Sequence, residues 1–285
     1  MKVQSCALAL AALLVPSSPA HAFEDEYFGY TYGAGVPEKG ETETEFWLTD
    51  RRGKDGGHYD AQDYRLELEH GLTDRFAASA YLNLDGHHVR GLEPGLKETN
   101  RNLALEGASA EFRYNLLSPD NGGFGFTLYA EPGWSRTHGA LGDKGAEYEV
   151  ELKAILQKNF AGDRLVWAAN FTFEPEWERE HSGPGAEWER ELKIEASTGL
   201  SCRVGHGFYA GLEARYASVY PDWMGGLHRE TYALFAGPSI HYDAGPWWIT
   251  ATYLPQLVGS PSRGGSLALD EYERRELRLK IGFEL

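Results

Sequence analysis

The chain has 285 residues, of which 42% are hydrophobic, 25% charged and 13% aromatic. Its 27 Lys and Arg residues against 43 Asp and Glu residues give a formal net charge of −16, so we expect no nucleic-acid partner. The aromatic content excludes a disordered chain, and two cysteines exclude a disulfide scaffold. A mean hydropathy of −0.47 excludes a bundle of membrane-spanning helices.

The first 22 residues have the three parts of a secretory signal peptide. A basic start at Lys2 precedes an apolar run from Ala7 to Val15, and the small residues Ala20 and Ala22 suit a signal peptidase. The run is too short for a membrane span, which needs about 20 apolar residues. Cleavage near Ala22 would leave Cys202 as the only mature thiol, and its role stays open.

Long segments of the mature chain alternate between apolar and polar residues. From Leu277 to Leu285 every odd position is apolar and every even position is charged or glycine. A period of two is typical of strands with one apolar and one polar face. Their length suits membrane-crossing strands of about 9–11 residues. The predicted strands, twelve in number, are 41–49, 59–70, 76–85, 103–114, 124–135, 147–158, 165–177, 187–202, 208–219, 231–242, 247–256 and 273–285.

The connections between these strands alternate in length. Turns rich in Gly, Asn, Asp and Pro form the shorter set, at 71–75, 115–123, 159–164, 203–207 and 243–246. The other set is mostly longer and polar, at 50–58, 86–102, 136–146, 178–186, 220–230 and 257–272. We predict an all-β fold: a closed antiparallel up-and-down transmembrane β-barrel with short periplasmic turns and longer extracellular loops.

Aromatic residues indicate which face of the strands points outward. An aromatic or apolar residue follows each short turn, and tryptophans lie at the opposite strand ends, as in the interfacial girdles of lipid-facing barrels. An apolar lining inside so many strands would leave a void that side chains could not fill. We therefore place the apolar face toward lipid. The predicted girdle residues are Phe76, Phe124, Trp134, Trp167, Trp177, Trp188, Phe208, Trp247 and Trp248.

Three segments resemble Gram-negative outer-membrane β-barrel proteins. Lys280–Leu285 looks like their C-terminal assembly signal, although Phe283 stands two residues before the final Leu285. Gly71–Phe76 is similar to a turn at their periplasmic hairpins, and residues 37–49 resemble the start of an uncharacterised outer-membrane barrel family. The resemblance implies a location in the outer membrane, contact with outer-membrane lipid, and help from the outer-membrane assembly machinery during biogenesis.

The polar faces of the predicted strands would line the lumen. The chain then divides into a signal peptide (1–22), an N-terminal periplasmic or lumen segment (23–40) and the barrel (41–285). We expect the following charged side chains in the lumen: Glu43, Glu45, Arg65, Glu67, Glu69, Glu111, Arg113, Glu131, Glu149, Glu151, Lys153, Glu191, Lys193, Glu195, Glu213, Arg215, Arg278 and Lys280.

Two interpretations of these charges stay open. In one interpretation, charged neighbours on a strand form ion pairs, such as Arg65 with Glu67, and the barrel is rigid and plugged. Arg113 beside Glu111 and Lys193 beside Glu191 would pair in the same way. In the other, the acidic excess lines an aqueous path that favours cations over anions.

Residues that could support catalysis or metal binding lack the required spacing. Ser239 and His241 share a strand face, but such positions lie about 7 Å apart. The adjacent His87 and His88, with His58, Asp60 and Asp63 in another loop, match no known metal motif. We therefore expect no catalytic residue, no metal and no cofactor.

The leading functional expectation is a passive channel for small solutes or ions with an acidic-biased lumen. One alternative is an outer-membrane enzyme acting on envelope lipid, which needs a nucleophile and a base in hydrogen-bond reach. The other is a closed structural or surface-binding barrel whose long loops carry its role. Neither the solute nor the oligomeric state follows from the sequence.

Overall fold

The computed structural model describes residues 26–92, 98–119, 123–138, 143–180, 187–261 and 265–285, so the predicted signal peptide lies outside the described residues. No helix among these residues is long and apolar enough to span a membrane. The strands are β1 (Thr42–Arg52), β2 (His58–Thr73), β3 (Phe76–Arg90), β4 (Thr99–Leu117), β5 (Phe124–His138), β6 (Asp143–Phe160), β7 (Leu165–Glu180), β8 (Glu189–Arg203), β9 (Phe208–Pro221), β10 (Thr231–Asp243), β11 (Trp247–Ser260) and β12 (Arg275–Glu284).

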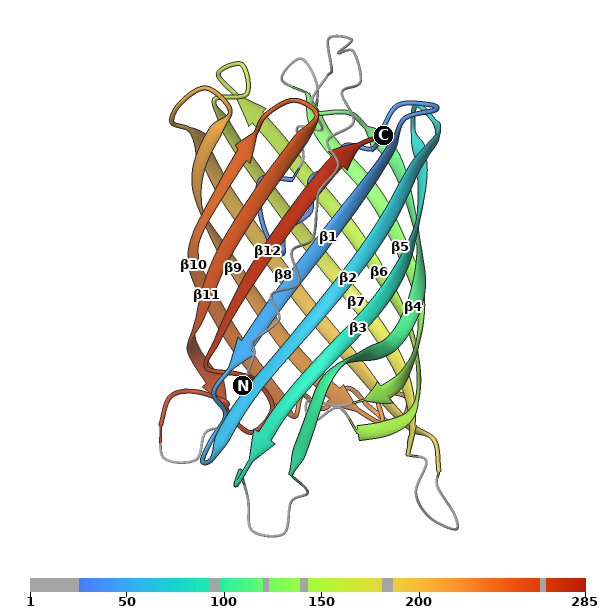
Figure 1. Ribbon diagram of the computed structural model, residues 1–285, viewed down its shortest axis with the longest axis vertical. Helices are drawn as coiled ribbons and strands as arrows, with labels where there is room; N and C mark the ends of the chain where they lie inside the picture. The colour runs from blue at the N-terminus through green and yellow to red at the C-terminus, as the bar shows by residue number, and fades with distance from the viewer. Residues whose placement is uncertain (1–25, 93–97, 120–122, 139–142, 181–186, 262–264) are drawn as a thin grey trace, which may run out of the picture.

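The twelve strands close into one barrel (Figure 1). Each strand pairs antiparallel with the next one in the chain, and β1 also pairs with β12. This closing seam runs from Glu43 opposite Glu284 to Arg52 opposite Arg275. Closure leaves no sheet edge with unpaired backbone groups, which a lipid environment would not tolerate. The predicted up-and-down barrel and its strand number are confirmed.

The barrel has two different ends. β1 begins and β12 ends beside the short turns, and we call this the short-turn end, at the top of Figure 1; the opposite end is the loop end. Strands extend further toward the loop end than predicted: β3 reaches Arg90 and β11 reaches Ser260. The alternation fades there because both faces of a strand meet water outside an apolar layer, whereas the backbone ladder continues.

The short turns use left-handed backbone conformations. Between β6 and β7, Ala161, Gly162 and Asp163 have φ angles of 54°, 63° and 59°. Gly207, before β9, has a φ of 68°, and a Cβ at this position would overlap the carbonyl oxygen of Asp243. Glycine adopts this conformation at no steric cost, so the turn chemistry read from the sequence closes these hairpins.

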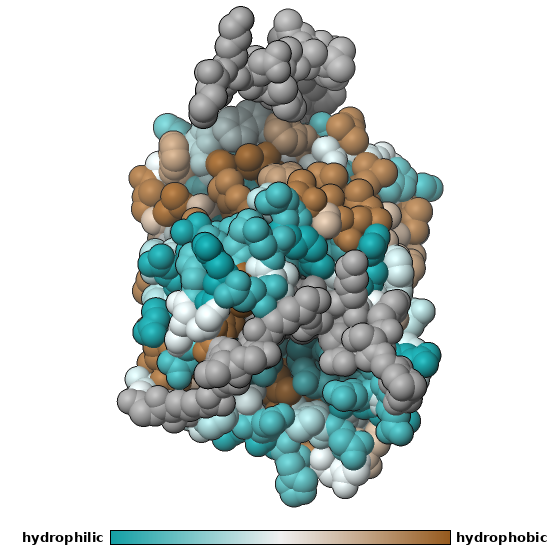
Figure 2. Space-filling view, turned by 60° about the horizontal axis from the view of Figure 1, so that its bottom comes forward, coloured by the Kyte–Doolittle hydropathy of each residue, from teal (hydrophilic) through white to brown (hydrophobic). Residues whose placement is uncertain are grey.

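Side chains alternate across the barrel wall in the opposite sense to a soluble protein. Leu68 of β2 is 51% exposed and its neighbour Glu69 only 1%, while Phe171 of β7 is 58% exposed beside Asn170 at 1%. Hydrophobic residues cover the wall in the upper part of Figure 2, whereas the loop end, turned forward, is mainly hydrophilic. A wall of exposed apolar side chains around buried charges suits lipid, and the predicted orientation of the faces is confirmed.

Candidate functional site

Residues 26–37, which precede β1, run inside the barrel (Figure 1). We call residues 26–38 the N-terminal segment. At one side the Glu26 carboxylate pairs with Lys280 of β12, and at the other the Gly40 amide donates to the Gly71 carbonyl of β2, 2.8 Å away. Between these points Tyr30 packs in a cluster with Phe235 of β10 and other buried residues. The segment therefore fills part of the lumen instead of lying below it.

One carboxylate holds the first half of the segment by its backbone. Glu213 of β9 accepts hydrogen bonds from the amides of Gly29, Tyr30 and Thr31 at 3.2, 2.8 and 2.5 Å. The Gly29 carbonyl also accepts from Arg278 of β12, at 3.2 Å. A buried carboxylate that accepts several backbone N–H bonds forms strong, charge-assisted contacts. Glu213 is therefore the principal anchor of this half.

Amide side chains hold the second half. Asn170 of β7 accepts from the Tyr32 amide at 2.7 Å and donates to the Tyr32 carbonyl at 3.0 Å. Gln157 of β6 accepts from the Ala34 amide at 2.7 Å, and Asn115 of β4 donates to the Ala34 carbonyl at 2.6 Å. Since these partners come from β4, β6 and β7, and those of the first half from β9 and β12, the segment crosses the lumen toward the short-turn end.

Aromatic rings fill the space between the segment and the wall. Gly199 of β8 leaves room for Phe28, because a Cβ there would overlap the ring. Tyr30 lies beside two cations, with Arg278 at 3.9 Å and Arg215 at 5.2 Å from the ring centre. Such cation–π contacts bind a cation without a counter-charge, so the rings and the wall arginines stabilise one another.

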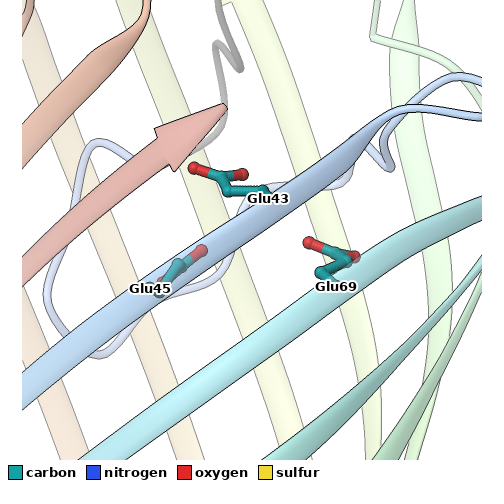
Figure 3. Close-up of side chains that lie close together, drawn as sticks. All are labelled: Glu43, Glu45 and Glu69. Carbon is teal, nitrogen blue, oxygen red and sulfur yellow. The ribbon is translucent and has the colours of Figure 1, made fainter. Parts of the chain in front are cut away.

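A group of three carboxylates lies in the wall next to the segment (Figure 3). Glu43 and Glu45 of β1 and Glu69 of β2 have oxygens within 4.8 Å of one another. Each already has a strong partner. The indole of Trp248 donates to Glu43 at 2.5 Å, the indole of Trp47 donates to Glu45 at 2.5 Å, and Arg113 pairs with Glu69. These carboxylates are thus part of a hydrogen-bonded wall, which argues against a metal site here.

A second carboxylate group faces the loop end. Oxygens of Glu147 and Glu149 on β6 and of Glu176 on β7 lie within 4.8 Å of one another. Lys193 of β8 pairs with Glu176 at 2.5 Å, while Glu147 and Glu149 are only half-buried. We call these three glutamates the loop-end acidic group. It combines three carboxyl groups, only one of which is paired with a lysine among the described residues, with partial access to water.

Several ion pairs inside the barrel link different strands, although Lys153 pairs with Glu151 on β6 itself. Arg65 of β2 pairs with Glu131 of β5 at 2.5 Å, not with Glu67. Lys193 pairs with Glu176 and not with Glu191. Positions two apart on a strand are about 7 Å apart, farther than residues opposite each other on adjacent strands. Of the pairs expected along a strand, Arg113 does contact Glu111, at 2.9 Å, but it also pairs with Glu69.

The loop between β11 and β12 folds into the barrel from the loop end. Tyr272 packs edge-on against Phe235 at 6.2 Å, and Lys54 donates to the Glu271 carbonyl at 2.5 Å. Glu273 in this loop is buried and lies 3.7 Å from Arg51. Burial, and then the nearby Glu276, raise the pKa of Glu273 to about 8. The loop therefore carries a carboxyl group that is neutral in weakly acidic solution.

We predict that Glu273→Gln raises the unfolding temperature at about pH 9 and leaves it nearly unchanged at about pH 4. Because the pKa of Glu273 is raised in the folded protein, its burial does not destabilise the fold at a pH below the pKa that it has in the unfolded chain. The folded protein loses this stability as pH rises through about 8. The neutral amide removes that loss, on the order of 1–3 kcal/mol. Heat-dependent gel mobility at the two pH values measures the change in unfolding temperature. An equal change at both pH values would contradict the raised pKa of Glu273.

The predicted lumen residues all lie within the described part of the chain. Buried are Glu43, Glu45, Glu67, Glu69, Glu111, Arg113, Glu131, Lys153, Glu213 and Lys280. Half-buried are Arg65, Glu149, Glu151, Glu191, Lys193, Glu195, Arg215 and Arg278. Sequence reasoning missed the inner residues Glu147, Glu174, Glu176 and Glu276. The same alternation could have found them, since Glu174 and Glu176 share the parity of the buried Asn170.

The predicted girdle residues face outward with one exception. Exposed residues are Phe124, Trp134, Trp188, Phe208 and Trp247, and half-buried ones are Phe76, Trp167 and Trp177. Trp248 is corrected: it is 3% exposed and donates to Glu43 inside the barrel. Adjacent strand residues point to opposite faces, so Trp247 and Trp248 cannot both face lipid. At the C-terminus, the side chains of Phe283 and Leu285 are exposed.

The residues considered for catalysis have other partners. The Ser239 hydroxyl donates to the Tyr27 carbonyl at 2.9 Å, and His241 Nδ1 lies 2.8 Å from the Thr250 hydroxyl. Both side chains are buried under the N-terminal segment. His87 is buried beside Asp85, 3.3 Å away, whereas His88 is half-buried. Nothing in this geometry brings a nucleophile to a base at a lipid-facing surface.

The closed barrel with an apolar outer face and a charged interior defines the class: an outer-membrane β-barrel, with its short-turn end toward the periplasm and its loop end outside. Residues 19–285 match the model of a family of unknown function, DUF6662. The chain belongs to this family. No curated protein has a significantly similar sequence.

Two solved structures share the fold at low sequence identity. The COG4313 outer membrane channel from Pseudomonas putida F1 superimposes with a TM-score of 0.60 at 14% identity, covering 88% of this chain and 98% of that one. The β domain of the Bordetella autotransporter BrkA has a TM-score of 0.52 at 10% identity, covering 87% of this chain and 100% of that one. At such identities the similarity concerns the fold alone.

Proposed function

We propose that the protein is an outer-membrane channel whose N-terminal segment closes the lumen, and that small cations or cationic solutes pass when this segment leaves. The proposal rests on the hydrogen bonds that hold the segment inside the barrel. Polar side chains of β4, β6, β7, β9 and β12 bind its backbone, while the barrel wall is closed by its own strand pairing. The wall therefore does not need the segment to remain a barrel.

The bonds that hold the segment suit a reversible closure. Each hydrogen bond exchanged for one to water is worth only about 0.5–1.5 kcal/mol net. Water entering the lumen can replace the side-chain partners one after another. The P. putida protein with the same fold is an outer membrane channel, which supports a transport role for this barrel.

The direction of selectivity is proposed from the loop-end acidic group. Glu147 and Glu149 are half-buried and can meet a solute that enters from outside. A ring or cluster of carboxylates at a pore mouth attracts cations and repels anions. We therefore propose cations or positively charged small solutes as the substrate class.

A closed structural barrel is the second candidate. It is favoured by the apolar packing of the segment, in which Tyr27, Phe28 and Tyr209 form a buried cluster with residues of the wall. Such packing would keep the lumen shut permanently. An enzyme acting on envelope lipid is not favoured, because Ser239 and His241 are bound to Tyr27 and Thr250 instead of to each other.

The test compares Glu213→Ala with Glu191→Ala in planar lipid bilayers. Loss of Glu213 leaves the amides of Gly29, Tyr30 and Thr31 without their acceptor, which costs about 1–3 kcal/mol for a buried group. We expect the open probability to rise about tenfold or more. The control Glu191 is a half-buried carboxylate near the loop end. An open probability equal for both variants would refute closure by the segment.

A further inference from the structure

Arginine and tryptophan side chains meet on the outer wall near the loop end. On β7 and β8, Trp177 lies opposite Arg190 in the strand register. The Arg179 guanidinium lies 5.9 Å from the ring centre of Trp188. The loop after β9 adds Trp223, whose ring packs edge-on against Phe173 at 6.2 Å. We call the following residues the outer rim patch: Trp177, Arg179, Trp188, Arg190, Trp223 and Met224.

This patch faces away from the lumen. Phe171 and Phe173 are exposed and have the same parity on β7 as Trp177 and Arg179. Trp188, just before β8, and Arg190 of β8 are exposed and share the parity of the exposed Leu200. The loop after β9 presents Met224 at 62% exposure. The patch thus meets the membrane at the level of the outer aromatic girdle.

The charge of the patch contrasts with the rest of the protein. The chain carries a formal net charge of −16, and Glu176 of β7 is buried inside the barrel, whereas Glu189 of β8 is exposed. Among the described residues no carboxylate forms an ion pair with Arg190, whose Nη1 lies 3.7 Å from the Met224 sulfur. The other N–H donors of its planar guanidinium lie on the outer surface.

We propose that the outer rim patch binds a phosphorylated, acylated lipid of the outer leaflet. Guanidinium groups bind phosphate with two parallel N–H bonds, which supplies both charge and geometry. Indole rings at a membrane interface place their apolar body toward acyl chains and their N–H toward head groups. Met224 extends the apolar surface beside Arg190. This site is independent of whether the lumen conducts.

The experiment measures binding of diphosphoryl lipid A to the purified full-length protein in a zwitterionic detergent, by native mass spectrometry. Wild type is compared with the double variant Arg179→Gln, Arg190→Gln. The matched control is Arg75→Gln with Arg164→Gln, since both are exposed arginines in short turns. Heat-dependent gel mobility verifies that every variant is folded. A second variant, Trp188→Ala, removes the ring but keeps both charges.

We expect the double variant to bind diphosphoryl lipid A about tenfold more weakly, and the control to bind as wild type does. Trp188→Ala should weaken binding less. Phosphatidylethanolamine, which has no net charge, should not compete. Equal binding by wild type and the double variant would overturn the proposal. An equal loss of binding in the control variant would also overturn the proposal, because binding would then follow overall charge. Competition by inorganic phosphate alone would overturn it as well, because the acyl chains would then contribute nothing.

Discussion

Deletion of residues 27–36 is expected to turn a mostly closed barrel into a steadily conducting one. The deletion removes the backbone groups that bind Glu213, Asn170 and Gln157 but leaves every strand and its pairing intact. Several hydrogen bonds of about 1 kcal/mol each then no longer hold the closed state, and the open probability should rise about 100-fold or more. Single-channel recording in planar bilayers measures it.

A matched variant separates the role of the rings from that of the backbone. Replacement of Tyr27, Phe28, Tyr30 and Tyr32 by Ser keeps the length of the segment and its backbone bonds. We expect an intermediate open probability, because apolar packing is lost while the polar contacts remain. A deletion variant that is folded by gel mobility but never conducts would contradict the channel and support the closed structural barrel.

Neutralising the loop-end acidic group should reduce the preference for cations. In the segment-deleted background, Glu147→Gln, Glu149→Gln and Glu176→Gln together replace three carboxyl groups by neutral amides and leave Lys193 without the carboxylate of Glu176. The local potential then becomes less negative, and the cation-to-anion permeability ratio should fall severalfold. Reversal potentials in a salt gradient give this ratio directly.

The control for selectivity changes charges outside the lumen. Glu38→Gln, Glu41→Gln and Asp74→Asn remove the same formal charge at exposed positions of the short-turn end. Charges there are screened by salt within about 10 Å, so the permeability ratio should stay near that of the parent. A ratio that does not change in the loop-end variant, or changes equally in both, would contradict the proposed selectivity.

The barrel could be predicted because its information is local. The alternation of Leu68 with Glu69 fixes which side chain meets lipid, and it repeats strand after strand. The same alternation places Glu174 and Glu176 on the inner face, so its consistent use along β7 would have predicted them. Trp248 follows a short turn, the position that predicts a girdle residue, but it lies inside the barrel because neighbours on a strand face opposite sides.

The path of the N-terminal segment through the lumen could not be predicted because its contacts are distant in sequence. The Gly29 amide bonds to Glu213, 184 residues away, and nothing periodic marks residues 26–38. Arg65 likewise pairs with Glu131, 66 positions away, instead of its neighbour Glu67. Only barrel closure brings such groups together, so their partners follow from the three-dimensional arrangement.

Amide hydrogen exchange of the N-terminal segment in the native, detergent-solubilised protein tests the central claim most directly. The amides of Gly29, Tyr30, Thr31, Tyr32 and Ala34 bind buried side chains of the wall. Exchange of a peptide over these residues should be slowed about 1,000-fold or more relative to unstructured chain, and Glu213→Ala should remove much of that protection. Exchange at the rate of unstructured chain in the wild-type protein would mean that the segment does not occupy the barrel.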